Sequence, residues 1–128
     1  MEQREDLKGA VRVLAELVKK PEAIPDRIEA REVVADTRAR LADYKSQLGQ
    51  FAQAREEVRA GMQLAQDPTY FRGHLFEVQG LVAERQAKEL KAAGQLAAAK
   101  KAEADALDAF EKAMSVQEQV IEQALPEK

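Results

Sequence analysis

The chain has 128 residues, no cysteine and a formal net charge of −3, and 34% of its residues are charged, 45% hydrophobic and 5% aromatic. That length allows one domain with one modest core, and the lack of cysteine excludes disulfides and thiolate chemistry. The slight excess of acidic residues disfavours a nucleic-acid partner.

The N-terminal segment has the pattern of an amphipathic helix over about residues 5–20, which Pro21 ends. It lacks the apolar core and cleavage site of a signal peptide. No apolar run in the chain approaches the roughly 20 residues that span a membrane. We therefore expect a cytoplasmic domain without a membrane partner.

Proline and glycine divide the rest of the chain, which is rich in strong helix formers, into four more expected helices. These helices cover about residues 26–48, 51–66, 69–93 and 95–124. Asp26 is the expected N-cap of the second helix, and Glu29 completes a reciprocal cap. No stretch alternates apolar and polar residues with a period of two, so the sequence predicts an all-α fold built from antiparallel helical hairpins.

Apolar residues at three- and four-residue spacing mark the expected core face of each helix. On the second helix this stripe comprises Ala30, Val34, Thr37, Leu41, Tyr44 and Leu48. On the third helix it comprises Phe51, Ala54, Val58, Met62 and Ala65, and on the fourth it begins with Phe71, Leu75, Val78 and Val82. On the fifth helix, the residues that recur at seven-residue steps are Leu107, Met114 and Ile121.

Small and large residues alternate regularly in segment 106–114, ALDAFEKAM, which contains Ala106, Phe110 and Ala113. This spacing resembles helix B of a tetratricopeptide repeat. Residues 41–68 resemble a complete repeat with Gly49 at the turn, although Arg38 stands where the family has a tryptophan. The resemblance implies a superhelix of stacked helical hairpins.

The second hairpin is expected to be longer than an ordinary repeat. Phe76 and Gly80 stand where helix A of the repeat has an aromatic residue and a glycine. Gly80 lies fourteen residues before Gly94, and Gly94 lies twelve before Ala106, where the resemblance implies about seven and about five. Each helix should therefore be seven residues longer, which is two helical turns or about 10 Å.

The expected architecture is a tetratricopeptide-like α-α superhelix of about five helices in a single domain, residues 1–128. Its parts are an N-terminal helix at 5–20, a first hairpin at 26–66 and an elongated second hairpin at 69–124. The alternative is a helical bundle in which the spacing of Ala and Phe is ordinary core packing.

The sequence lacks the residues that catalysis or cofactor binding would need. His74 is the only histidine, and there is no Cys or second His to complete a nucleophilic triad or a zinc site. The six glycines fall singly, so there is no phosphate-binding loop. We therefore expect no enzyme activity, no catalytic residue, no metal site and no cofactor.

Five arginines on successive helices could form a phosphate-binding face or pair with neighbouring glutamates: Arg27, Arg31, Arg38, Arg55 and Arg59. Ion pairing is the favoured interpretation because the arginines are interleaved with Glu29, Glu32, Glu56 and Glu57. Aromatic residues that could stack on bases are missing from this region.

The resemblance implies that a peptide or partner helix binds in the concave groove of the superhelix. Projected onto this sequence, that groove is lined by Asp36, Asp43, Gln47, His74, Glu77, Leu81, Glu84 and Arg85. The family's clamp for acidic chaperone tails has Lys and Asn where this chain has Asp43 and Leu81, so such a tail is not the expected ligand. The acidic balance favours a protein or peptide partner with exposed Lys or Arg.

The expected function is that of a non-catalytic protein–protein interaction module, a scaffold or adaptor. The first alternative is a structural building block that forms homo-oligomers through the Ala-rich part of the long hairpin, about residues 84–105. The second alternative is an enzyme or ligand binder that uses the acidic groove.

Overall fold

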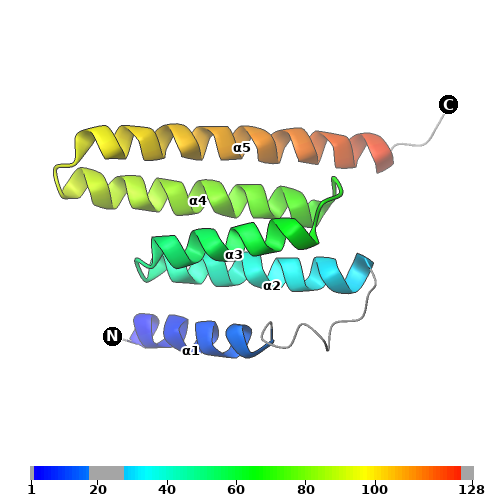
Figure 1. Ribbon diagram of the computed structural model, residues 1–128, viewed down its shortest axis with the longest axis horizontal. Helices are drawn as coiled ribbons and strands as arrows, with labels where there is room; N and C mark the ends of the chain where they lie inside the picture. The colour runs from blue at the N-terminus through cyan, green and yellow to red at the C-terminus, as the bar shows by residue number, and fades with distance from the viewer. Residues whose placement is uncertain (1, 18–27, 125–128) are drawn as a thin grey trace.

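The computed structural model describes residues 2–17 and 28–124, and these residues form five α-helices and no strand (Figure 1). The helices are α1 Glu2–Leu17, α2 Ile28–Gln47, α3 Phe51–Leu64, α4 Tyr70–Ala92 and α5 Leu96–Ala124. The predicted all-α fold class is confirmed, and α2 to α5 begin and end within two residues of the expected positions. The expected N-cap Asp26 and the expected end of the first helix lie outside the described residues.

Both hairpin turns have the same backbone geometry. Gly49 and Gly94 have φ angles of 81° and 80°, in the left-handed region that side chains with a Cβ disfavour. The N–H of Gln50 donates to Lys45 O at 2.8 Å, and the N–H of Gln95 donates to Leu90 O at 2.9 Å. These are the 6→1 bonds of a Schellman motif, so each glycine ends one helix and reverses the chain into the next.

The five helices lie side by side in chain order (Figure 1). α4 packs on both helices of the first hairpin, whereas α5 packs on α4 alone among the described helices. The second hairpin is the longer one, with 23 and 29 residues in α4 and α5 against 20 and 14 in α2 and α3. Its turn extends beyond the turn of the first hairpin (Figure 1).

The core is built mainly from small side chains that let the helices approach closely. Its buried members are Ala35, Ala39, Ala42, Ala54, Val58, Ala65, Leu75, Val78 and Val82. The stripes predicted on the third and fourth helices are confirmed, since their members are buried or packed against this cluster. The stripe predicted on the second helix is wrong in part, because Val34, Thr37 and Tyr44 are only half-buried.

The error on α2 has a physical cause. α2 contacts α1, α3 and α4, so it buries more than one side and has no single core stripe. Its most buried positions are three alanines, which a pattern of large apolar residues does not find.

Candidate functional site

Four of the predicted groove residues pair with one another across the interface between α2 and α4. His74 Nδ1 lies 2.9 Å from Asp36 Oδ1. Arg85 donates hydrogen bonds to the Asp43 carboxylate and, at 2.7 Å, to the Ser46 hydroxyl. These polar groups therefore hold α4 against α2.

A fifth predicted residue, Gln47, belongs to the same cluster through its hydrogen bond to Asp43 at 3.2 Å. His74 also stacks on Tyr70, with ring centroids 6.1 Å apart. The cluster thus occupies the side of α4 that faces the first hairpin.

The remaining predicted residues, Glu77, Leu81 and Glu84, adjoin this cluster on α4, since Leu81 lies seven residues after His74 and Glu84 is next to Arg85. Their spacing of four and three residues places them along one line of the helix. Glu77 and Glu84 are exposed and Leu81 is half-buried. This line runs beside α5, because Glu84 lines a groove together with Leu107 and Phe110.

That groove has a volume of about 440 Å³ and lies between α4 and α5 near their turn. Ala87, Ala106, Leu107 and Phe110 supply its apolar lining. Charged side chains form its rims, with Glu84, Lys88 and Lys91 on α4 and Glu103 on α5. An apolar floor with charged rims suits the apolar side of an amphipathic helix.

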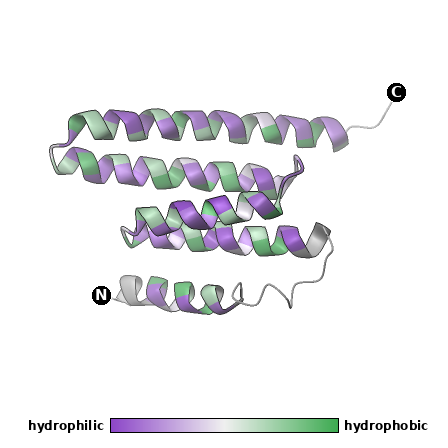
Figure 2. Ribbon diagram, viewed as in Figure 1, coloured by the Kyte–Doolittle hydropathy of each residue, from purple (hydrophilic) through white to green (hydrophobic). Residues whose placement is uncertain are grey.

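Large apolar side chains continue from this groove along α5. The expectation that Leu107, Met114 and Ile121 lie on the core face of their helix is wrong, because these side chains are 64%, 61% and 61% exposed. Their seven-residue spacing puts them on one line of the helix, as in the seam of a coiled coil. Figure 2 shows hydrophobic bands along the length of α5, which lies at one edge of the stack.

A different side of α5 is buried against α4. Its buried residues are Ala99, Ala102, Ala106, Ala109, Ala113 and Val116. Phe110 lies at the border of this surface and packs so closely on α4 that a Cβ on Gly80 would be 2.5 Å from its ring. Ala106 and Ala113, the small residues of the segment that resembles helix B, are therefore buried in the contact with α4.

The exposed side of α5 can be compared with the side of α3, in the first hairpin, that contacts α4. On α3, Arg55 hydrogen-bonds to Gln86 of α4. Met62 Sδ lies 3.7 Å from a guanidinium nitrogen of Arg72, also on α4. Arg55 and Met62 therefore mark the side of α3 on which α4 docks.

Aligning Ala54 with Ala106, as the resemblance to a repeat implies, puts Leu107 and Met114 of α5 at the positions of Arg55 and Met62, one and eight residues after the alanine. No helix in the described part of the chain covers this side of α5. We call this surface, with the adjoining side of α4, the outer face: Tyr70, Glu77, Leu81, Glu84 and Lys88 of α4 and Leu107, Phe110, Met114 and Ile121 of α5.

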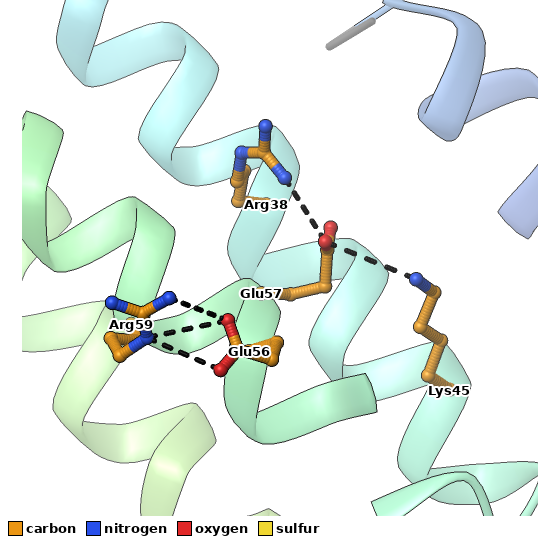
Figure 3. A network of polar contacts seen from close by, with 5 residues as sticks. All are labelled: Arg38, Lys45, Glu56, Glu57 and Arg59. Atoms are coloured by element: carbon orange, nitrogen blue, oxygen red, sulfur yellow. Dashed lines mark hydrogen bonds and ion pairs between the residues drawn. The ribbon is translucent and has the colours of Figure 1, made fainter. Parts of the chain in front are cut away.

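The predicted pairing of arginines with glutamates is confirmed for two of them (Figure 3). Arg38 Nη1 lies 3.0 Å from Glu57 Oε1, and Lys45 Nζ lies 3.9 Å from the same oxygen. Arg59 pairs with Glu56 at 2.8 Å, and its hydrogen bond and charge hold the pKa of Glu56 below the usual value.

These pairs occupy two of the guanidinium groups that a phosphate-binding face would use. Arg55 is bound to Gln86 and so differs from the expectation of a glutamate partner. Arg27 lies outside the described residues.

Among residues 2–17 and 28–124, no group of three or more His, Asp or Glu side chains is placed to hold a metal ion. None of the described helices is both long enough and apolar enough to cross a bilayer.

No protein-family model, curated protein or solved structure matches this chain.

Proposed function

We propose that this protein is a non-catalytic interaction module of tetratricopeptide-like architecture that binds an α-helix of a protein partner on its outer face. The observation that carries the proposal is the line of Leu107, Met114 and Ile121, each more than 60% exposed. Large exposed apolar side chains that gather on one side of a helix are a feature of interaction surfaces.

The energetics of covering this line favour binding. Fully burying a side chain of this size contributes about 1.5–3 kcal/mol, so covering three that are already partly buried contributes roughly 3–5 kcal/mol. The half-buried Phe110 and Leu81 add apolar area beside the line. A micromolar dissociation constant corresponds to a binding free energy of about 8 kcal/mol. Polar contacts at the rims of the groove would have to supply the remainder.

The similarity of the two hairpins supports the tetratricopeptide-like architecture. Their equal turns and the docking of α4 on the first hairpin support a repeat in which each hairpin offers a place to the next helix. A helix from a partner would take the corresponding place on the second hairpin.

A synthetic amphipathic helix of about 20 residues, with leucines at three- and four-residue spacing and glutamines elsewhere, tests the proposal. We expect it to bind the full chain in a fluorescence anisotropy titration. Met114→Glu should weaken binding at least tenfold, because the carboxylate would be buried without a partner. Val33→Glu is the matched control, since Val33 is 59% exposed on α2, away from the outer face.

No binding by the wild-type protein, or equal binding by the Met114→Glu variant, would contradict the proposal. Circular dichroism of both variants separates a loss of binding from a loss of fold.

A homo-oligomeric building block is the second candidate, and the seven-residue spacing on α5 favours it. That spacing is the repeat of a coiled-coil seam, so the same line could pair with its copy on a second chain. Sedimentation equilibrium distinguishes the two candidates. A dimer that Met114→Glu converts into a monomer would establish the building block.

A further inference from the structure

We infer that the partner helix is basic along its flanks and that Glu77 and Glu84 select it. This inference rests on the proposed function, because it identifies the chemistry of the partner for the same outer face. The carrying observation is that the first hairpin already binds a helix in this way, within the chain itself.

On the first hairpin, acidic residues of α2 receive basic residues of α4. Asp36 and Asp43 lie seven residues apart on α2. Asp36 contacts His74, and Asp43 accepts a hydrogen bond from Arg85. A row of carboxylates on α2 thus borders the apolar contacts that α4 makes with the first hairpin.

A second row of carboxylates lies one helix later, on α4. Glu77 and Glu84 also lie seven residues apart, on the side of α4 that adjoins the exposed line of α5. Both are exposed, and neither has a hydrogen bond or ion pair within the described part of the chain. Their carboxylates are therefore available to a second molecule.

The other border of the exposed line is acidic as well. Glu111 and Glu118 each follow a residue of the line by four positions and are exposed. Basic groups on the same surface lie near the turn: Lys88 and Lys91 line the groove, and Lys100 precedes Leu107 by seven residues. The outer face is thus acidic over most of its length and basic at the turn, which favours a helix with Arg or Lys over the acidic part.

The size of the effect follows from the exposure of these groups. An exposed ion pair changes affinity by less than about fivefold, so the two pairs made by Glu77 and Glu84 should give a preference of roughly tenfold. The preference should decrease as salt is added, because exposed charges are screened within about 10 Å at 0.1 M.

The test uses two synthetic helices that share the same leucine stripe and carry either arginine or glutamine on the flanks. We expect the full chain to bind the arginine peptide about tenfold more tightly at low salt. The double variant Glu77→Gln/Glu84→Gln should lose this preference while binding the glutamine peptide as before. The matched control is Asp108→Asn/Asp105→Asn, which changes the charge equally on the opposite side of the hairpin, where both residues line a cavity with Arg55.

Equal affinity for the two peptides, or a preference that survives in the double variant, would overturn the inference while leaving the proposed function intact. Failure of the glutamine peptide to bind at all would contradict the proposed function instead. A dimer formed through Met114 would overturn the inference too, because a second copy would then occupy the outer face.

Discussion

Replacing Gly80 by alanine tests whether α4 and α5 approach each other as closely as the structure shows. A Cβ on Gly80 would lie 2.5, 2.7 and 2.8 Å from Cε1, Cδ1 and Cζ of the Phe110 ring. Favourable carbon–carbon contacts begin near 3.5 Å, so the ring or a helix would have to move by about 1 Å.

Two opposing effects set the magnitude. Alanine favours a helix over glycine by about 1 kcal/mol. Overpacking a fitted contact costs about 1–3 kcal/mol. Three atoms of one ring are involved, so we expect overpacking to prevail and the free energy of unfolding to fall by about 1 kcal/mol.

Gly73 provides a matched control one heptad earlier on the same helix. A Cβ there would meet Cγ of Gln117 at 3.4 Å, and Gln117 is an exposed, flexible side chain that can give way. Gly73→Ala should therefore stabilise the protein by up to about 1 kcal/mol.

Thermal and urea unfolding followed by circular dichroism measure both changes. For a chain of this length, 1 kcal/mol corresponds to a shift in Tm of about 4 °C. In a Phe110→Leu background, Gly80→Ala should no longer destabilise, because the ring that it meets is absent. If Gly80→Ala stabilises the protein as much as Gly73→Ala does, the close approach of α4 and α5 is wrong.

Two further predictions concern the first hairpin and the long turn. Glu57→Gln should lower the free energy of unfolding by about 1–3 kcal/mol, since Arg38 and Lys45 would lose their shared carboxylate at a buried position. Urea titration measures this, and Glu56→Gln is the control that should change little, because the ion pair of Glu56 with Arg59 is exposed to solvent. Amide hydrogen exchange should be fastest among the helical residues next to Gly94, where residues 91–98 are all exposed. Protection there equal to that at Leu75 and Val78 would contradict the prediction.

The helices and turns could be predicted from the sequence because their signals are local. Gly49 and Gly94 end helices through backbone geometry that only the neighbouring residues determine. The buried face of α2 could not be predicted in full, because it depends on three other helices that pack around it. Alanines carry little hydrophobic signal, yet they fill the closest contacts.

The candidate site was predictable only in part. The sequence showed that Leu107, Met114 and Ile121 share one side of a helix, but periodicity does not tell whether that side is buried. The pairs that join Asp36 to His74 and Asp43 to Arg85 span 38 and 42 residues, so no local pattern reveals them.

Among the described helices α5 contacts only α4, and this affects which helices separate first when the protein unfolds locally. α4 is in contact with α2, α3 and α5, whereas α5 can separate by losing one interface, which is lined mostly by alanine. Such an interface buries little area per residue, so we expect α5 to open at a lower free energy than α4 does. A ligand that spans α4 and α5 would close this opening, because separation of the two helices would also require its release. A protease should therefore cleave α5 more slowly when a ligand occupies the outer face.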